Sequence, residues 1–265
     1  MPPDHSTSPV LACPHCMGAL HLDAVGAHCD TGHSFDRARE GYLNLLVTGR
    51  LATTAVAGDT TDALIARRSF LSANWYSPIA DALSKTLGEV DGPVLDVGCG
   101  EGYYLSHVMS PMKYGIDISK KAVQMASKLL PSAQFAVASA FRLPVLPQSL
   151  AAVFTVFAPH SFEEYNRVLV PGGKWVTVTP GPNHLVQMRP EYDTDTKADE
   201  RFERRNEPPA EAVSAERVQF TLDLSSEAAE ALFSMTPLRW QTAAAATPAQ
   251  HVGVDVWVSV GTTPR

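Results

Sequence analysis

The stretch VLDVGCGEGY, residues 94–103, runs from a short apolar segment straight into a glycine-rich turn. Gly98, Gly100 and Gly102 alternate through the turn, and Tyr103 begins a segment that predicts a helix. Glycines allow a tight turn and a close approach of the backbone to a ligand, and a helix N-terminus offers unpaired N–H groups. This order of strand, glycine turn and helix is typical of a nucleotide-binding unit.

Strands and helices continue to alternate from this turn toward the C-terminus. Asp117 ends the second apolar segment, seventeen residues after Gly100, and an acid at about this separation reaches the hydroxyls of a ribose. The stretch VGVDVWVSV, residues 252–260, alternates as an antiparallel strand does. The sequence therefore predicts an α/β fold with a mostly parallel, seven-stranded sheet and helices on both faces. The predicted strands are 94–97, 114–118, 134–138, 150–157, 174–179, 218–224 and 252–260.

The N-terminal region carries a metal-binding pattern. Cys13 and Cys16 form one close pair, and Cys29 and His33 form a second pair after twelve intervening residues. Two such pairs can complete a tetrahedron around zinc, and four protein ligands make a closed, structural site. Buried or redox-active thiols are the competing interpretation. The alternative histidine ligands are His15, His21 and His28.

These patterns divide the chain into three parts. Residues 1–46 form a zinc-binding module, 47–90 a linker with helices that lead into the sheet, and 91–265 the large domain. Within the large domain, residues 187–216 are rich in charge and lack apolar periodicity, which predicts an insertion or a lid over the edge of the sheet.

A predicted helix in the middle part carries two adjacent arginines. Asp59 or Thr60 is expected to cap this helix at its N-terminus. Arg67 and Arg68 cannot both face the core. They either lie on a solvated face or contact a phosphate or a cofactor carboxylate, to which a guanidinium group is suited.

Composition limits the class of protein. The net charge of −7 argues against non-specific coating of nucleic acid, and four cysteines do not make a disulfide framework for 265 residues. No stretch approaches eighteen apolar residues, and MPPDHSTSPV lacks the features of a signal peptide. We therefore expect a soluble, cytoplasmic protein that does not associate with a membrane.

The glycine turn, the acid-ended second strand and the RLP loop after the third strand resemble class I methyltransferases, which bind S-adenosylmethionine. The resemblance implies that the turn lies against the methionine part of the cofactor, the acid holds the ribose and the loop contacts adenine. The positions that match these motifs are Asp96, Gly98, Gly100, Gly102, Asp117, Ser139 and Ala140. We expect nearby residues to complete the cofactor site, namely Tyr103, Ile118, Arg142, Ala158 and Arg67. Many relatives have Asp where Ser139 stands, so an adenine contact here would use a hydroxyl and a backbone N–H.

A longer series of motifs resembles the 23S ribosomal RNA (guanine-N1)-methyltransferase family, including its macrolide-resistance members. In chain order these are CPHC, HCDTGHSFD, REGYLNLL, GDT with ARRSFL, WYSPI, VLDVGCGEGYY, RLP, FAP and VTPGPNHL. The family implies a structural Zn²⁺, a zinc module that helps to recognise an RNA hairpin in domain II of 23S rRNA, and a homodimer. His160 stands where relatives often carry a cysteine.

The resemblance predicts methyl transfer to N1 of a guanine in that hairpin. N1 carries a proton at neutral pH, so the reaction needs proton removal as well as an in-line approach to the sulfonium methyl group. The predicted catalytic residues are Asp59, His160 and Pro159, with Asp59, His160 or water as the proton acceptor. Positioning alone can supply up to about 7–11 kcal/mol, so we expect it to outweigh any one base. The candidate phosphate contacts are Arg37, Arg39, Arg50, Arg67 and Arg68.

Three alternative functions share some of these features. A nicotinamide-dependent dehydrogenase would also use a glycine turn, although with the spacing GxGxxG, whereas this chain has GCGEG. A small-molecule methyltransferase would use the same cofactor without RNA. A non-catalytic RNA-binding relative would keep the zinc module and bind S-adenosylmethionine poorly.

Overall fold

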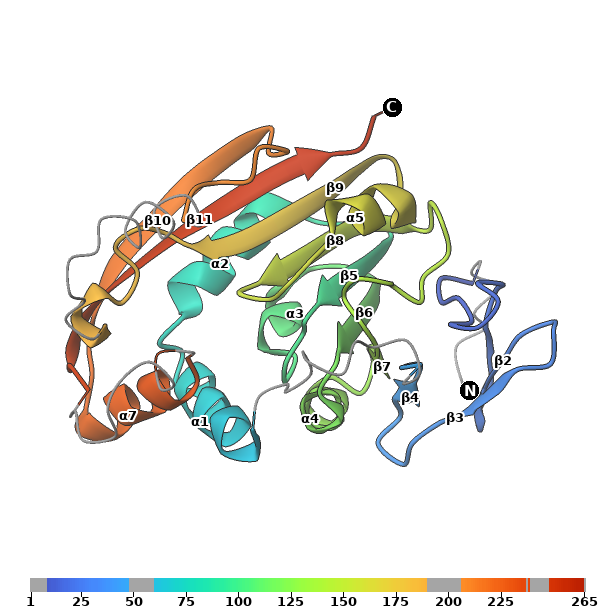
Figure 1. Cartoon of the computed structure of the whole chain (residues 1–265), viewed down its shortest axis with the longest axis horizontal. Coiled ribbons are helices and arrows are strands. Elements are labelled where there is room, and N and C mark those ends of the chain that lie inside the picture. Colours follow the sequence, from blue (N-terminus) through green and yellow to red (C-terminus); the bar gives the residue numbers. More distant parts are fainter. Residues whose placement is uncertain (1–8, 48–59, 190–205, 237, 239–247, 265) are drawn as a thin grey trace.

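The computed structural model describes residues 9–47, 60–189, 206–236, 238 and 248–264. Within these residues the chain builds an eight-stranded sheet in the order β10-β11-β9-β8-β5-β6-β7-β4 and a three-stranded sheet in the order β1-β2-β3. Figure 1 shows the small sheet beside the β7 and β4 end of the large one. Across these ranges, no helix has the length and apolar character needed to span a membrane.

Parallel strands form the centre of the large sheet. They are β5 (Pro93–Val97), β6 (Met112–Asp117), β7 (Gln134–Val137) and β8 (Leu150–Val156). Most side chains of β5 and β8 are buried, as expected for parallel strands that are covered on both faces. The four predicted strands are therefore confirmed. Their carboxyl ends meet at one edge of the sheet, where the glycine turn follows β5 and Asp117 ends β6.

Three longer strands complete the other side of the sheet. They are β9 (Leu169–Pro180), β10 (Ser214–Asp223) and β11 (His251–Thr262). β9 runs parallel to β8, and β11 lies antiparallel between β9 and β10, which confirms the predicted direction of the last strand. The predicted insertion 187–216 ends too late, because Ser214 already begins β10 and pairs with Val260. Residues 190–205 of that segment lie outside the described residues.

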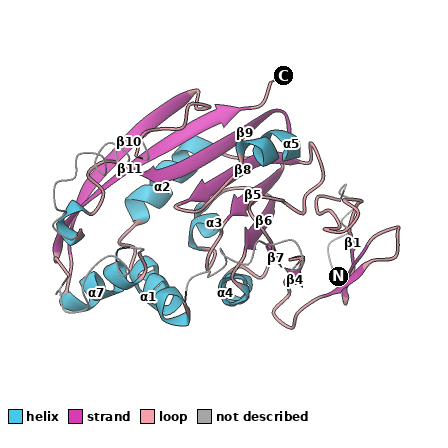
Figure 2. Ribbon diagram, viewed as in Figure 1, coloured by secondary structure: helices cyan, strands magenta, loops and turns pink. Residues whose placement is uncertain are grey.

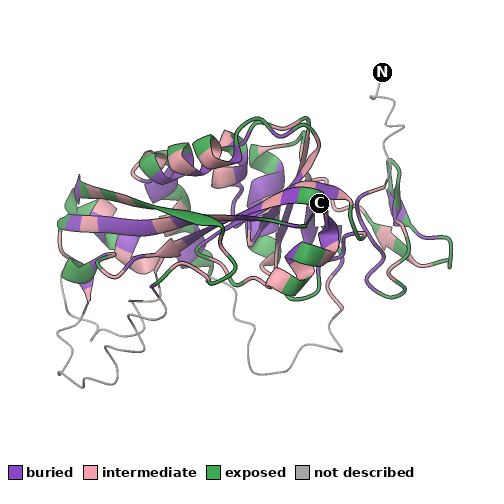
Figure 3. Cartoon of the chain, turned by 90° about the horizontal axis from the view of Figure 1, so that it is seen from above, coloured by how far each residue is buried: buried purple, intermediate pink, exposed green. Residues whose placement is uncertain are grey.

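Helices lie on both sides of the sheet (Figure 3). Side-chain oxygens of Thr60, Ser119, Ser161 and Ser225 cap four of them by accepting a backbone N–H three residues ahead. Thr60 is thus the observed cap of the first helix, and Asp59, the other predicted cap, lies outside the described residues. The helices are α1 (Thr61–Ser72), α2 (Ser77–Leu87), α3 (Tyr103–His107), α4 (Lys120–Leu129), α5 (Phe162–Val168) and α7 (Ser226–Ser234), with a 3-10 turn, η2 (Val186–Met188).

The N-terminal module consists mostly of loops and short strands (Figure 2). Its antiparallel sheet contains β1 (His21–Leu22), β2 (Gly26–His28) and β3 (Ser34–Asp36). The next strand, β4 (Leu43–Asn44), leaves the module and pairs in parallel with β7. The large sheet therefore has eight strands, one more than the seven predicted from the sequence. Two residues are too few to show a sequence period, and only their pairing with β7 marks them as a strand.

Hydrogen bonds and shared core packing join the module to the large domain. The N–H of Ala12 donates to the carbonyl of Pro144 at 2.9 Å, and the N–H of Leu146 donates to the carbonyl of Val10 at 2.9 Å. One guanidinium nitrogen of Arg37 donates to the carbonyl of Gly41 and to Oε1 of Gln134 in β7. The module and the large domain also share one hydrophobic cluster, which includes Cys13, Leu20, Leu143, Val145 and Leu150.

Candidate active site and metal centre

The glycine turn between β5 and α3 is enclosed by two other elements. Gly98 has φ +76°, and a Cβ atom there would lie 2.3 Å from Cβ of Ala158, just after β8. A Cβ atom on Gly102, which has φ +88°, would lie 3.2 Å from Cβ of Ala126 in α4. Gly100 has more room, because the nearest atom to its Cβ position is Nη1 of Arg67 at 3.8 Å. The turn is thus held tightly at its two ends, with space at its centre.

Asp117 is fixed against this turn. Its Oδ2 accepts a hydrogen bond from the N–H of Gly100 at 2.9 Å, and its Oδ1 accepts one from the N–H of Ser119 at 2.8 Å. Ile118, between them, is half-buried. Because both carboxylate oxygens are anchored by backbone donors, the acid has a defined orientation beside the turn, as a residue that binds a ribose requires.

Asp96 is a buried carboxyl near the end of β5. It is 1% exposed, and among the described residues its Oδ2 has no hydrogen-bond partner. Burial, together with the charge of Asp117, raises the pKa of Asp96 well above its usual range. Buried polar atoms are normally paired, so an unpaired one beside a ligand-binding turn fits a bound molecule that brings donors. S-adenosylmethionine carries an ammonium group and ribose hydroxyls that can act as such donors.

Glu101 is a site residue that the sequence interpretation missed. It lies in the glycine turn and is 5% exposed, and its Oε2 has no partner among the described residues. Burial raises its pKa to about 7, although Arg68 and Arg67 act in the opposite direction. No sequence pattern marks it, because its burial depends on how α1 packs over the turn. A cavity of about 260 Å³ opens beside it, lined by Arg68, Ser72, Glu101, Tyr103, Ser106, His107, Met125 and Leu129.

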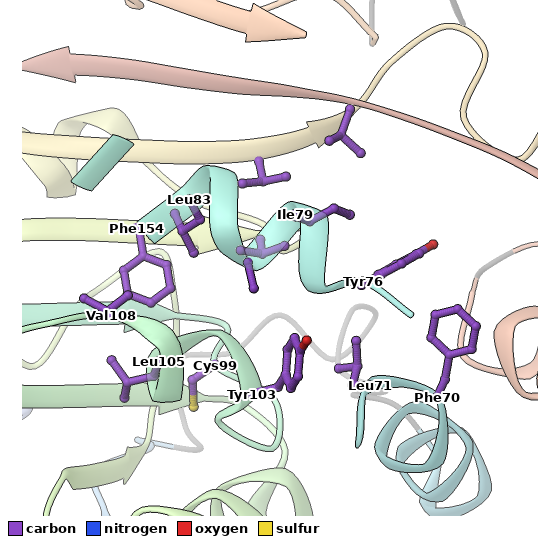
Figure 4. Close-up of a cluster of buried hydrophobic side chains, with 14 of the residues drawn as sticks. Phe70, Leu71, Tyr76, Ile79, Leu83, Cys99, Tyr103, Leu105, Val108 and Phe154 are labelled. Atoms are coloured by element: carbon purple, nitrogen blue, oxygen red, sulfur yellow. The ribbon is translucent and has the colours of Figure 1, made fainter. Parts of the chain in front are cut away.

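Tyr103 directly follows the turn, and Nη1 of Arg67 lies 3.8 Å from the Cβ position of Gly100. The Tyr103 ring is 7% exposed and lies in the core with Cys99 and Leu71 (Figure 4). Arg67 is half-buried, and its Nη2 donates to the carbonyl of Met235 at the end of α7 at 3.3 Å. The structure therefore places both predicted cofactor residues at the turn.

The loop after β7 carries the predicted adenine contacts. The hydroxyl of Ser139 accepts a hydrogen bond from the N–H of Phe141 at 3.2 Å, which shapes the start of the loop. Ala140 is half-buried, whereas Arg142 is exposed. The N–H of Ala138 donates to the carbonyl of Asp117, so this loop leaves the sheet next to the acid.

His160 is packed into an aromatic cluster after β8. Its ring stacks on Tyr165 at a centroid distance of 5.8 Å and meets the ring of Phe162 edge-on at 4.9 Å. Nδ1 lies 3.2 Å from the carbonyl oxygen of Ala158, and Pro159 between them is exposed. The structure thus brings Ala158 and Pro159 to the turn at the end of β8. Asp59, the other predicted base, lies outside the described residues, as does Arg50.

A second histidine lies near the end of β8. The ring of His184 lies 5.5 Å from that of Phe157, which in turn lies 6.2 Å from that of Tyr76. Burial, with a smaller contribution from the charge of Arg189, lowers the pKa of His184 to about 4, so the imidazole is neutral at pH 7. The sequence interpretation did not single out His184. Tyr76 is 2% exposed and packs in the hydrophobic core.

An ion pair between the buried Asp255 and the exposed Arg217 holds the segment that carries His184. Asp255 in β11 is 2% exposed and accepts two hydrogen bonds of 2.7 Å from the guanidinium group of Arg217. Its Oδ2 also accepts the N–H of Asn183 at 2.8 Å, and its backbone N–H lies 3.3 Å from Nδ1 of His184. The pair therefore fixes the loop after β9 against β11.

The four predicted metal ligands converge in the N-terminal module. The ligand atoms of Cys13, Cys16, Cys29 and His33 all lie within 4.8 Å of one another. The Cys16 and Cys29 sulfurs are 3.7 Å apart, and a tetrahedron with Zn–S distances of about 2.3 Å has S–S edges of roughly 3.8 Å. Hydrogen bonding, mainly from Thr31, lowers the pKa of Cys29 to about 5, which favours the thiolate that binds metal. Three cysteines and one histidine in this arrangement fit a closed zinc site.

The three alternative histidines have other contacts. His15 stacks on His33 at a centroid distance of 4.9 Å. His21 and His28 lie 3.3 Å and 3.7 Å from carboxylate oxygens of Asp30 and Asp23. None of the three belongs to the four-ligand cluster found among the described residues.

A parallel sheet with a glycine turn after β5, an acid at the end of β6 and an antiparallel β11 defines a class I methyltransferase, whose cofactor is S-adenosylmethionine. In agreement, a methyltransferase-domain family matches residues 94–173, and the zinc-ribbon family described as RlmA, N-terminal, matches residues 11–48. The 23S rRNA (guanine(748)-N(1))-methyltransferase of Streptomyces fradiae is 35% identical over 243 residues, which cover 87% of this chain and 85% of that protein. The chain belongs to the 23S rRNA (guanine-N1)-methyltransferase family.

Two further relatives support this assignment. A Micromonospora griseorubida protein, for which 23S rRNA (guanine-N1) methylation is proposed, is 33% identical, with 97% of this chain and 96% of that protein covered. The protein YxjB of Bacillus subtilis, with the same proposed activity, is 29% identical, and the match covers 86% of each chain. The matches span the zinc ribbon and the methyltransferase domain together, so the chain is an S-adenosylmethionine-dependent methyltransferase with a zinc ribbon.

Proposed function

We propose that this protein transfers the methyl group of S-adenosylmethionine to N1 of a guanine in a hairpin loop of domain II of 23S rRNA. The observation that carries the proposal is the similarity to the Streptomyces fradiae enzyme over 87% of the chain, which includes both the ribbon and the catalytic domain. The name of that relative places its target at guanine 748. An effect on macrolide sensitivity belongs to the same proposal.

The cofactor would lie along the edge of the sheet from the glycine turn to the loop after β7. In this arrangement Asp117 binds the ribose, and Ile118, Ser139 and Ala140 surround the adenine. The backbone at Gly98, Gly100 and Gly102 approaches the methionine part, for which the space at the centre of the turn leaves room. The remaining predicted contacts are Asp96, Tyr103, Arg142, Ala158 and Arg67, to which the geometry adds Glu101.

Charge supports the placement of the methionine end. Its ammonium group needs a negatively charged partner, and its carboxylate needs a positively charged one. The unpaired carboxyl of Glu101 in the turn and the guanidinium group of Arg67 near it can supply these charges. A bound ammonium group would favour the ionised form of Glu101, whose pKa burial otherwise raises.

The target base would enter beside Ala158, Pro159 and His160. A loop guanine is easier to unstack than one in a duplex, and flipping it into a pocket exposes N1. The proton on N1 would pass to Asp59, to His160 or to water. Because His160 is held by Tyr165 and Phe162, its part in proton removal rests on Nε2, the ring nitrogen that faces away from the carbonyl of Ala158.

The domain arrangement follows the same proposal. Residues 1–46 serve as the zinc-binding RNA-recognition module, 47–90 connect it to the sheet, and 91–265 perform methyl transfer, with the segment from 187 toward β10 as an insertion or lid. The enzyme acts as a homodimer in the cytoplasm, where ribosomal RNA is assembled.

Primer extension tests this function directly. A methyl group on N1 blocks Watson–Crick pairing, so reverse transcriptase stops at the modified guanine. We expect a stop in domain II of 23S rRNA that requires the wild-type protein and S-adenosylmethionine, and that Asp117→Ala abolishes. A small-molecule methyltransferase would give no stop while still consuming the cofactor, and a non-catalytic RNA-binding relative would bind the RNA without consuming it.

A further inference from the structure

A cluster of exposed cations and one exposed aromatic ring lies at the ends of β6 and β7. Lys120 and Lys121, in the first turn of α4, and Arg142, in the loop after β7, are all exposed. Phe141, next to Arg142, is 64% exposed, although a ring of this size is normally covered. We name these four residues the β6–β7 rim.

The cations of the rim are available to a ligand. Within the described part of the chain, the side chains of Lys120, Lys121 and Arg142 make no salt bridge and no hydrogen bond. Arg142 lowers the pKa of Glu164 by its charge, but the carboxylate of Glu164 is hydrogen-bonded to Arg167. The first turn of α4 also contains no acidic residue that could neutralise the lysines. The rim is thus a local positive surface on a chain whose net charge is −7.

The strand register brings the four residues to one place. Asp117 pairs with Val137 in the parallel β6–β7 ladder, and the N–H of Ala138 donates to the carbonyl of Asp117 at 3.0 Å. The segments that follow the two strands therefore leave the sheet side by side. The segment after β6 starts at Asp117, which we assign to the cofactor ribose, and the segment after β7 starts beside it at Ala138, so the rim borders the proposed active site.

The same loop continues from the rim to the zinc ribbon. Two residues after Arg142, the carbonyl of Pro144 accepts the hydrogen bond from Ala12, which directly precedes the metal ligand Cys13. Figure 1 shows β7 between the ribbon and the centre of the sheet. An RNA that contacts both the ribbon and the catalytic cleft would pass this rim.

Two of the arginines predicted as phosphate contacts are engaged within the fold. Arg37 donates hydrogen bonds to the carbonyls of Gly41 and Asp23 and to Oε1 of Gln134, so it is used within the fold. Arg67 donates to the carbonyl of Met235. Of the arginines predicted from the sequence as phosphate contacts, these two therefore have structural roles, whereas Arg39 and Arg68 are exposed.

We propose that the β6–β7 rim binds the RNA strand between the ribbon and the active site, with the ring of Phe141 stacked on a base and Lys120, Lys121 and Arg142 on phosphates. An aromatic ring flanked by cations is the combination that proteins use to hold single-stranded RNA. The inference rests on RNA being the substrate, as proposed above.

Equilibrium binding of the full-length protein to two RNA probes tests the rim. The probes are a transcript of domain II of 23S rRNA and an unrelated hairpin of equal length. The variants are Phe141→Ala, Phe141→Trp and the triple variant Lys120→Ala/Lys121→Ala/Arg142→Ala. Lys85→Ala, which removes an exposed cation on α2, is the matched charge control.

We expect Phe141→Ala to weaken binding of both probes by roughly 5- to 150-fold, the loss for one stacked base, and Phe141→Trp to restore it. The triple variant should reduce the slope of log K against log salt concentration by about 2–3, since each lost phosphate contact removes roughly 0.7–0.9. Lys85→Ala should leave binding within twofold of the wild type. Calorimetry should give the S-adenosylmethionine affinity of the wild type for Phe141→Ala, Phe141→Trp and Lys85→Ala.

Three results would overturn the proposal. The first is unchanged RNA affinity and salt slope in the rim variants. The second is a loss of S-adenosylmethionine affinity in Phe141→Ala that accounts for the whole defect, because the ring would then cover the cofactor. The third is the absence of RNA binding by the wild type. Failure of the proposed function looks different: the wild type binds RNA and the rim variants weaken that binding, yet no methyl group reaches the domain II transcript.

Discussion

The N–H of Gly100 donates a hydrogen bond to Oδ2 of Asp117 across 2.9 Å, so the turn after β5 and the acid that ends β6 hold each other in place. The second oxygen of Asp117 is held in turn by the N–H of Ser119. Because backbone donors of the protein itself hold both carboxylate oxygens, the binding edge is preorganised, and less ordering is needed when the cofactor binds.

Removing the carboxylate of Asp117 should therefore affect both the ligand and the turn. We expect Asp117→Ala to weaken S-adenosylmethionine binding by roughly 10- to 150-fold, the range for hydrogen bonds to a charged group. Asp117→Asn keeps an acceptor for Gly100 and should lose less. Calorimetric titration measures both, with Glu89→Ala, an exposed acid before β5, as the control. Equal affinity in Asp117→Ala and the wild type would remove Asp117 from the cofactor site.

Regular patterns explain why this part of the site could be predicted from the sequence. The glycine turn has a fixed spacing, and an acid at the end of the next strand has a defined distance from it in the chain. The metal ligands were equally predictable, because Cys13, Cys16, Cys29 and His33 follow the spacing that a tetrahedral ion imposes.

Features that depend on tertiary packing could not be predicted in this way. β4 contains only Leu43 and Asn44, and its pairing with β7 is a long-range contact that no local period records. Glu101 resembles a solvent-exposed turn residue in the sequence, and only the tertiary packing of the chain buries it. Burial of the His184 ring lowers its pKa. The loop after β9 that carries His184 has no sequence periodicity from which this burial could be predicted.

Glu101 should make the ligand-free protein less stable as the pH rises. Its pKa is about 7 in the folded chain and near 4.5 in the unfolded chain, so between these values only the folded chain holds the proton. The unfolded state therefore binds fewer protons in this window, and the free energy of unfolding falls as the pH increases from about 4.5 to 7.

Glu101→Gln should remove this dependence. We expect the melting temperature of the variant to exceed that of the wild type by about 2 °C or more at pH 8, because roughly 1 kcal/mol in the free energy of unfolding produces such a shift. At pH 4.5 the two melting temperatures should be equal. Thermal unfolding at the two pH values measures the difference. S-adenosylmethionine should stabilise the wild type more than the variant at pH 8, because Glu101 is proposed to bind the cofactor. An equal gain in melting temperature of Glu101→Gln at both pH values would contradict the assignment that Glu101 is protonated at pH 4.5 and ionised at pH 8.

Metal removal should affect the large domain as well as the ribbon. Cys13 follows Ala12, which donates to Pro144, and it shares a hydrophobic cluster with Leu143 and Val145. We expect one zinc per chain in the wild type and none in Cys13→Ser, together with faster amide exchange in residues 139–146. Elemental analysis and hydrogen exchange measure these outcomes.

His21→Ala is the matched control for the metal prediction. His21 is exposed and lies outside the four-ligand cluster, so the variant should keep one zinc per chain and the exchange rates of the wild type. Loss of zinc in His21→Ala would show that the ligand set is different. Unchanged exchange in residues 139–146 of zinc-free Cys13→Ser would show that the ribbon and the loop are independent.

The pair of Arg217 and Asp255 should stabilise the fold and hold the loop of His184. In Arg217→Ala, the carboxylate of Asp255, which is 2% exposed in the wild type, loses its guanidinium partner. Among the described residues it keeps only the hydrogen bond from the backbone N–H of Asn183. We expect the free energy of unfolding to fall by about 2–3 kcal/mol at pH 7, because a buried charge loses its counter-charge. Adding Asp255→Asn should recover part of this loss, since it removes the unpaired charge. Urea unfolding measures the three proteins, and Lys85→Ala controls for the removal of an exposed cation.

The pH dependence separates this pair from simple packing. Hydrogen bonding to Arg217 lowers the pKa of Asp255 below its ordinary value of 3.8. A lowered pKa means that the stabilisation is complete above pH 3.8 and disappears as the pH falls through the pKa of the folded state. The stability difference between the wild type and Arg217→Ala should therefore be constant from pH 5 to 7 and shrink toward pH 3. A difference that stays the same at pH 3 would mean that Arg217 stabilises the fold by contact with Trp257, over whose ring it lies at 5.5 Å, and not by its charge.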